Sequence, residues 1–285
     1  MKITSLVLGA ALAASVASSA VGAPLLRYTF DEASGNALDS GTAPLTDATF
    51  EGGAVRSTDT PSGAGFSLDL RNDAPYAHLL GQDAADLDGL SAITITTWLK
   101  VQSYPSGNHR LASKQNAGTF GGFNFSMNAT PNSGPVGADN FRVGMFIGNN
   151  VSSGAGDFGA AFSTDDVDAA DKWVMLAVTY DNSLATDNTR FYLGGVNSPM
   201  VQLGAPQTLP QITIDGGPAR FGVGFTDAAP TANTSVIGWQ DDVRVYGAAL
   251  QAAELERIRI EGIPEPSAAV LLGLGAALLA SRRRR

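Results

Sequence analysis

Short segments of alternating apolar and polar residues recur along this chain, separated by Gly, Pro, Asn and Asp. A period of two residues is typical of β-strands, and the separating residue types are typical of turns. The clearest segment covers residues 92–101. One of its faces is apolar and the other mixed, with Ile93, Ile95, Leu99 and Val101 set against Thr94, Thr96, Trp98 and Lys100. This pattern predicts a strand with two different faces.

Further segments have strand character: residues 141–147, 172–181, 190–193, 221–225 and 243–246. The second of these is apolar on both faces, which predicts a central strand, and the Asp/Asn-rich turn after it predicts a hairpin. The one good helical stretch is residues 248–260. Many strands and one short helix near the end predict an all-β sandwich.

Composition excludes several classes of protein. The chain has no cysteine, which excludes disulfide scaffolds, cysteine-based metal sites and thiol catalysis. Its formal net charge is −9, which argues against binding nucleic acid through a basic surface. Hydrophobic residues make up 44% of the chain, enough for a sizeable core. An acidic, Asp-rich surface suits cations or neutral sugars.

The N-terminus reads as a signal for export. Lys2 is followed by an apolar run over residues 6–17 and by small residues up to Ala23. This order resembles a secretory signal peptide over residues 1–22, with cleavage after Ala20 or Gly22. A permanent anchor helix is the alternative, but the apolar run is short for a bilayer span.

The C-terminus over residues 263–285 carries three signals in order: Pro264-Glu265-Pro266, an apolar segment and four arginines. An apolar segment followed by cations fits a stop-transfer signal. The segment is shorter than the roughly 20 residues that a permanent span prefers, which suits transient anchoring in the inner membrane. The arrangement resembles the PEP-CTERM sorting signal. That resemblance implies an exosortase, a membrane-embedded sorting peptidase, as a partner; a plain tail anchor is the alternative.

The middle of the chain, residues 23–262, resembles laminin-G-like domains of the concanavalin A-like superfamily. The resemblance rests on the opening residues 28–35, on the Trp-bearing strands at 93–100 and 171–181, and on the closing residues 238–246. It implies a jelly roll of two antiparallel sheets, with a short helix after the last strand and with the first and last strands close together.

A glucanase of this superfamily needs a pair of Glu side chains on one strand, one as acid and one as nucleophile. No Glu occurs between Gly52 and Ala253, the stretch that holds nearly every expected strand. No Gly-x-Ser-x-Gly motif of a serine hydrolase occurs either. The sequence therefore predicts that the protein is not an enzyme.

Asp241 is a candidate metal ligand. By strand alternation it shares a face with Val243 and Val245, so its carboxylate would be partly buried and would need a partner. Carboxylate and carbonyl oxygens suit calcium. The family resemblance implies a structural calcium held by Asp31 and Asp241, with backbone carbonyls completing the site. The alternative is that Asp241 accepts hydrogen bonds from backbone amides of the N-terminal segment.

Carbohydrate sites combine an aromatic platform with polar side chains, and binding residues concentrate on loops. The candidates expected on loops are Tyr104, Asn108, His109 and Arg110, with Trp239 near the closing strand. Residues 118–124 are expected to form a second flexible, aromatic-bearing segment.

Together these features predict an exported, surface-sorted, non-catalytic binding or adhesion module associated with the extracellular polysaccharide matrix. Two alternatives stay open. One is a glycan-active hydrolase with an atypical site, and the other is a structural matrix protein without a small ligand.

Overall fold

The computed structural model describes residues 22–43, 46–72, 76–103, 107–116, 120–128, 140–149, 158–224 and 235–263. Residues 1–21 of the expected signal peptide lie outside this part of the chain, as do the candidate Tyr104 and the sorting-signal residues Pro264, Glu265 and Pro266. Within the described ranges, no helix is long and apolar enough to cross a membrane.

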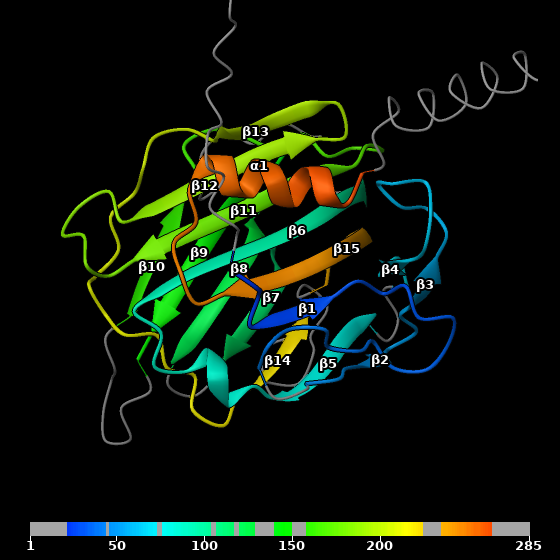
Figure 1. Ribbon diagram of the computed structural model, residues 1–285, viewed down its shortest axis with the longest axis horizontal. Helices are drawn as coiled ribbons and strands as arrows, with labels where there is room; N and C mark the ends of the chain where they lie inside the picture. Colours follow the sequence, from blue (N-terminus) through cyan, green and yellow to red (C-terminus); the bar gives the residue numbers. More distant parts are fainter. Residues whose placement is uncertain are drawn as a thin grey trace, which may run out of the picture.

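Two antiparallel sheets stack face to face (Figure 1). In the described residues, the eight-stranded sheet has the order β13 (Ser198–Gln202), β12 (Thr189–Gly195), β11 (Val174–Asp181), β6 (Ala92–Ser103), β15 (Ile237–Tyr246), β4 (Ser67–Asp69) and β3 (Val55–Ser57), with β1 (Leu26–Tyr28) also paired to β15. The seven-stranded sheet has the order β10 (Phe158–Phe162), β9 (Arg142–Gly148), β8 (Gly122–Asn128), β7 (Asn108–Gln115), β14 (Arg220–Val223), β5 (His78–Asp83) and β2 (Thr49–Glu51). The predicted all-β sandwich is confirmed.

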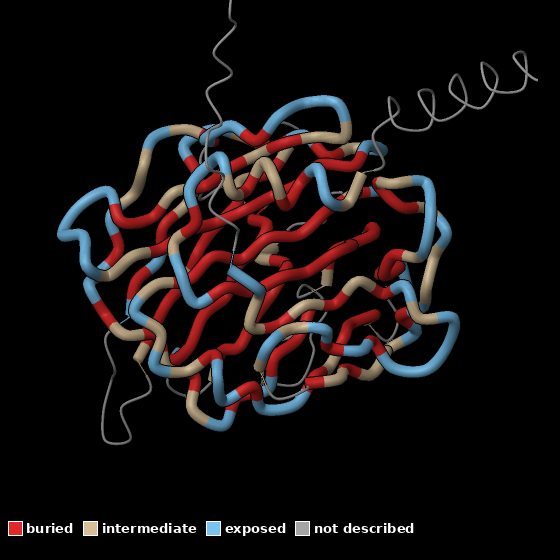
Figure 2. The backbone as a smooth tube through the Cα atoms, in the orientation of Figure 1, coloured by how far each residue is buried: buried red, intermediate tan, exposed pale blue. Residues whose placement is uncertain are grey.

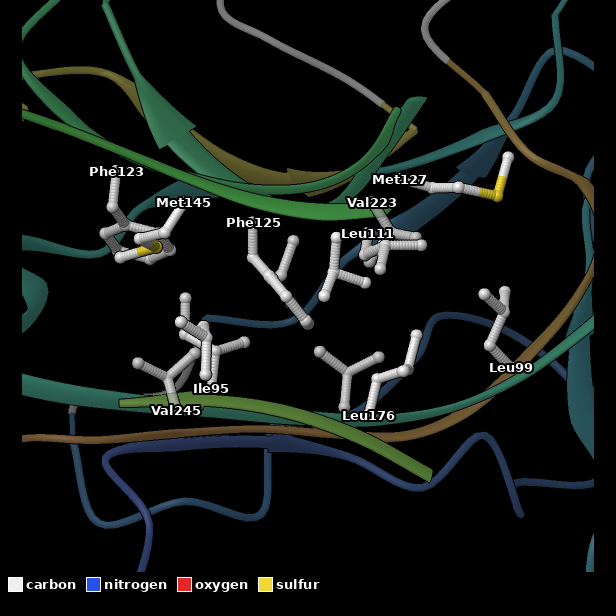
Figure 3. Close-up of a cluster of buried hydrophobic side chains, with 14 of the residues drawn as sticks. Ile95, Leu99, Leu111, Phe123, Phe125, Met127, Met145, Leu176, Val223 and Val245 are labelled. Atoms are coloured by element: carbon white, nitrogen blue, oxygen red, sulfur yellow. The ribbon is translucent and has the colours of Figure 1, made fainter. Parts of the chain in front are cut away.

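The core lies between the two sheets and is filled from both (Figure 3). Ile95 and Leu176 of the eight-stranded sheet point toward Leu111 and Phe125 of the seven-stranded sheet. All four side chains are fully buried. Because strand side chains alternate, each core residue is followed by one on the outer face, the face turned away from the other sheet.

The two faces predicted for residues 92–101 are confirmed in β6. Ile95 and Leu99 belong to the core, whereas Trp98 belongs to a second buried cluster on the outer face. The predicted central strand is β11, which lies between β6 and β12 and forms the expected hairpin with β12. Figure 2 shows that the central strands are buried along most of their length, whereas the loops are exposed.

Helix α1 (Ala252–Glu261) lies on the outer face of the eight-stranded sheet (Figure 1). It covers the second cluster, to which Leu255 and Ile258 contribute from the helix and Trp98 and Tyr246 from the sheet. The helix begins four residues later than predicted because Gln251 caps it. The Gln251 side chain accepts from the Glu254 amide while the Glu254 side chain accepts from the Gln251 amide. A short 3₁₀-helix, η1 (Ala85–Leu87), precedes β6.

The expectation of a flexible segment over residues 118–124 is wrong from Gly122 onward. Residues from Gly122 form β8, and Phe123 is fully buried in the core. The ring of Phe123 therefore points into the core, and the side chain of the next residue, Asn124, points to the outer face. The first and last strands lie side by side as the family resemblance implies, with Tyr28 of β1 opposite Val243 of β15.

Candidate functional site

The outer face of the seven-stranded sheet carries a row of polar side chains on β7 and β8. In β8 the core residues Phe123, Phe125 and Met127 alternate with outward residues, among them Asn124 and Ser126. In β7, Ser113 lies opposite Asn124, and Arg110 lies opposite Ser126. We call Asn108, Arg110, Ser113 and Asn124 together the polar face.

The polar face contains atoms that lack hydrogen bonds although they are buried. These atoms are Asn108 Oδ1, Arg110 Nε, Ser113 Oγ and Asn124 Oδ1, and none has a partner among the described residues. Leaving a buried donor or acceptor unsatisfied costs about 1–3 kcal/mol. Asn108 and Arg110 are partly exposed, whereas Ser113 and Asn124 are 0% and 1% exposed. The described residues hold four further atoms of this kind, on Thr96, Trp98, Trp239 and Gln240.

An aromatic group adjoins the polar face. Phe146 of β9 lies opposite Asn124, with its ring centroid 5.4 Å from that of Phe162 and 6.1 Å from that of Phe158. Phe120 extends the group at 5.5 Å from Phe158, and these two side chains are 56% and 44% exposed. The sheet thus presents apolar rings directly beside unsatisfied polar groups.

Gly144 makes room for this aromatic group. A Cβ atom at Gly144 would lie 2.6 Å from Cε1 of Phe162 and 3.4 Å from Oγ of Ser126. A residue larger than glycine at position 144 would therefore collide with the ring of Phe162.

Asn108 and His109 are not on a loop, contrary to expectation, because they are the first two residues of β7. Alternation sends their side chains to opposite faces. Asn108 belongs to the polar face. His109 is fully buried, and its Nδ1 lies 2.7 Å from the carbonyl oxygen of Ser235. Of these two candidates, only Asn108 lies on the outer face.

Trp239 lies on the outer face of the other sheet, away from Asn108. Its side chain is 8% exposed and belongs to the second buried cluster. The guanidinium of Arg71 lies 4.3 Å from its ring centroid, and Lys100 Nζ lies 5.0 Å from it. These cation–π contacts cover the ring of Trp239, which the sequence predicted to be a stacking platform for a sugar.

Asp31 and Asp241, the predicted metal ligands, do lie together. Both line one pocket of about 180 Å³ that is also lined by Asp242, Trp98 and Glu261. We call this the acidic pocket. It lies on the outer face of the eight-stranded sheet, where Asp241 is paired with Trp98 of β6.

The side of the strand predicted for Asp241 is wrong. The pairing of β15 with β6 shifts register between Asp241 and Arg244, which marks a β-bulge. Asp242 has φ = 45°, a left-handed conformation that is uncommon outside glycine. Because of this bulge, Val243 points into the core while Asp241 shares the outer face with Trp98.

The carboxyl of Asp241 is short of partners. Its Oδ1 accepts a hydrogen bond of 2.8 Å from the amide of Asp242, its own neighbour. Asp31 accepts from the amide of Phe66 at 2.9 Å. Burial raises the pKa of Asp241 well above its ordinary value, and the nearby charges of Asp242 and Asp31 raise it further. A bound cation would remove this penalty.

The oxygen-rich acidic pocket suits calcium, and Trp98 Nε1 in its wall is buried without an acceptor in the described residues. That indole N–H could donate to a ligand water. In the described part of the chain, no group of three or more His, Cys, Asp or Glu side chains is arranged to hold a metal. Calcium bound through Asp31, Asp241 and backbone carbonyls therefore stays a prediction.

Asp242 is already neutralised and is not a free ligand. Arg244 binds it through Nε and Nη2, at 3.0 Å and 2.6 Å, and Arg27 Nε lies 2.9 Å from its Oδ1. Arg244 also pairs with Glu261 at 2.8 Å. This network joins β1, β15 and the end of α1 beside the acidic pocket.

Comparison with known proteins decides the family. A model of a laminin-G-like family, described as the concanavalin A-like lectin/glucanases superfamily, matches residues 73–256, more than half of the chain. The chain belongs to this superfamily. No curated protein sequence matches this laminin-G-like chain.

Solved structures with a similar fold include two kinds of protein. Domain 4 of AbnA, a GH43 extracellular arabinanase from Geobacillus stearothermophilus solved with arabinotriose, is 15% identical, with a TM-score of 0.50 over 83% of this chain and 98% of that domain. The receptor-binding domain of botulinum neurotoxin type G is 14% identical, with a TM-score of 0.50 over 84% of this chain. That of the C/D mosaic serotype is 9% identical, with a TM-score of 0.52 over 84%.

The laminin-G-like chain spans about half of these two toxin structures, 51% of each. At these identities, the similarities show the shared fold. The concanavalin A-like fold is therefore found both in a domain solved with a bound sugar and in receptor-binding domains.

The raised pKa of Asp241 predicts a pH dependence of stability. Folding favours the protonated carboxyl, so without calcium the protein should lose stability as pH rises from about 4 toward neutral. Asp241→Asn should remove this loss. Calcium should raise the thermal midpoint of the natural protein at neutral pH and leave that of the variant unchanged.

Thermal unfolding with calcium or with a chelator, at acidic and neutral pH, checks both statements. Asp168→Asn is the matched control, because Asp168 is exposed and paired with Lys172. Equal midpoints of the natural protein with and without calcium would rule out the cation. A pH profile unaltered by Asp241→Asn would contradict the raised pKa.

Proposed function

We propose that this protein is a non-catalytic carbohydrate-binding module whose ligand lies against the polar face of the seven-stranded sheet. The observation that carries the proposal is the set of buried, unpartnered atoms of Asn108, Arg110, Ser113 and Asn124. Sugar hydroxyls both donate and accept hydrogen bonds, so a ligand of this class could bond to Asn108 and Arg110, the two of these residues that are partly exposed.

The neighbouring aromatic group supports the same ligand class. Binding sites for small molecules combine apolar and aromatic walls with a few placed polar groups. A pyranose ring has an apolar face and a hydroxylated edge. Phe146 lies directly opposite Asn124 on the adjacent strand and is partly exposed, so a sugar could stack on its ring beside the polar face.

The chemistry of these strands favours binding over hydrolysis. Glycoside hydrolysis requires two carboxyl groups on either side of the scissile bond. The strands β7, β8, β9, β10 and β14 contain no Asp or Glu. A sugar bound on this part of the sheet would therefore meet no catalytic pair from these strands.

Export and surface sorting complete the proposal. They are supported by the sequence signals at the two ends of the chain, including Pro264, Glu265 and Pro266. The C-terminal segment would anchor the protein transiently in the inner membrane, where an exosortase-type peptidase would process the tail. The protein would then act in the extracellular polysaccharide matrix. A structural calcium in the acidic pocket would fix Asp31 against the closing strand.

Two substitutions on the polar face test the binding proposal. Asn108→Ala removes an unsatisfied acceptor of a partly exposed residue, and Phe146→Ala removes the neighbouring ring. Each should weaken binding of the mature protein to its best glycan by about tenfold, since each removes about 1.4 kcal/mol of interaction. A glycan array identifies that glycan, and isothermal titration measures the affinity.

Arg190→Ala is the matched control, because Arg190 lies in another pocket of about 540 Å³ beside Tyr192 and the start of α1. It should leave the affinity unchanged. Silence of the natural protein on the array, or unchanged affinity of both polar-face variants, would contradict the proposal. Hydrolysis of the bound glycan would instead favour the glycan-active alternative.

The sorting signal is tested separately. Replacing Pro264, Glu265 and Pro266 by alanine should leave the protein in the inner membrane, because the sorting peptidase would no longer recognise the tail. Cell fractionation and immunoblotting measure the distribution. Release at the natural level would refute the sorting role without affecting the binding proposal.

A further inference from the structure

The strands that carry the polar face have a charge opposite to that of the whole chain. The chain has 27 acidic residues against 18 Lys and Arg. Strands β7, β8, β9, β10 and β14 contain no acidic residue, but they contain Arg110, Lys114, Arg142 and Arg220. Taken alone, the side chains of these strands therefore carry a net positive charge.

Two of these cations are neutralised within the protein. Lys114 is fully buried and points inward, where its Nζ lies 2.8 Å from Asp88 and 3.2 Å from Asp83. Arg142 Nε lies 3.0 Å from Asp166. Neither charge needs a partner from outside the chain.

Arg110 differs from both. Its Nη1 donates to the carbonyl oxygen of Asn108, its Nε is buried without an acceptor, and no carboxylate of the described residues pairs with it. Burial lowers the pKa of this guanidinium, because surroundings with little water disfavour its positive charge. A buried charge normally has a partner, because an unpaired one is costly.

We propose that the ligand of the polar face is an acidic glycan, with a carboxylate that pairs with Arg110. This inference rests on the proposed function and adds the chemical class of the sugar. A guanidinium is planar and binds a carboxylate through two parallel hydrogen bonds. The carboxylate of a uronic acid would pair with the guanidinium of Arg110, a residue that is partly exposed, while the sugar hydroxyls bond to the partly exposed Asn108.

The net charge of −9 does not oppose this inference at short range. Interactions between exposed charges are screened beyond about 8–10 Å at ordinary ionic strength. Arg110 lies opposite the neutral Ser126 of β8, and its Nη1 donates to the backbone carbonyl oxygen of Asn108. The local guanidinium would therefore decide whether a sugar with or without a carboxylate is preferred.

The test uses matched glycans that differ only in charge. Polygalacturonate, alginate and hyaluronan are each compared with their carboxyl-reduced forms, in which the carboxylate has become a primary alcohol. The mature protein should bind at least one acidic member about tenfold more tightly than its reduced form. Titration calorimetry and affinity electrophoresis measure the ratio.

Three variants show where this preference originates. Arg110→Gln should remove the preference, so that the acidic and reduced forms bind with equal affinity, and Arg110→Lys should keep part of it. Arg142→Gln is the matched control on the same sheet and should keep all of it. Melting curves of each variant show whether it is folded, and Arg110→Lys keeps the test decisive if Arg110→Gln is not.

The outcomes separate the two proposals. Equal binding to acidic and reduced forms, or a preference that persists in folded Arg110→Gln, overturns the acidic-glycan inference and leaves the proposed function standing. If the natural protein binds no acidic, reduced or neutral glycan, then carbohydrate binding itself is contradicted.

Discussion

The pairing of β6 with β15 is the interaction on which the rest of the structure depends. These strands lie at the centre of the eight-stranded sheet, and both of their faces are buried. Ile95 and Val245 fill the core on one side, while Trp98 and Tyr246 join α1 on the other. Because β15 also pairs with β1, this contact closes the fold and brings the acidic pocket together.

The outer faces of the two sheets differ in what covers their aromatic side chains. On the eight-stranded sheet, α1, Arg71 and Lys100 cover the aromatic side chains, although Thr96 Oγ1, Trp98 Nε1 and Trp239 Nε1 are also buried without a hydrogen-bond partner in the described residues. On the seven-stranded sheet, exposed rings lie beside buried polar atoms without partners in the described residues. The exposed rings of Phe120 and Phe158 distinguish this face from that of the other sheet, so the proposed binding is placed here.

Local sequence patterns predicted most of the fold, because alternation is a local property. The two faces of β6 and the central position of β11 follow directly from it. Alternation failed at Asp241, since the adjacent Asp242 adopts a left-handed conformation that inserts a bulge. Nothing in an Asp-Asp-Val-Arg sequence distinguishes a bulged strand from a regular one. The proximity of Asp31 to Asp241 came from the family resemblance and not from spacing.

The candidate site was harder to predict because it depends on pairing between distant segments. Arg110 was expected on a loop and Asn124 in a flexible segment, yet the register of β7 and β8 brings them to one face. The cover over Trp239 likewise depends on Arg71, which is far from it in sequence. Only the gaps in hydrogen bonding identify the polar face, and these require coordinates.

Hydrogen–deuterium exchange of the mature protein, with and without its glycan, measures most directly which sheet binds. The account predicts slower exchange over β7, β8 and β9 on binding, with β11, β12 and α1 unchanged. Protection confined to the eight-stranded sheet or α1, with the seven-stranded sheet unaffected, would contradict it.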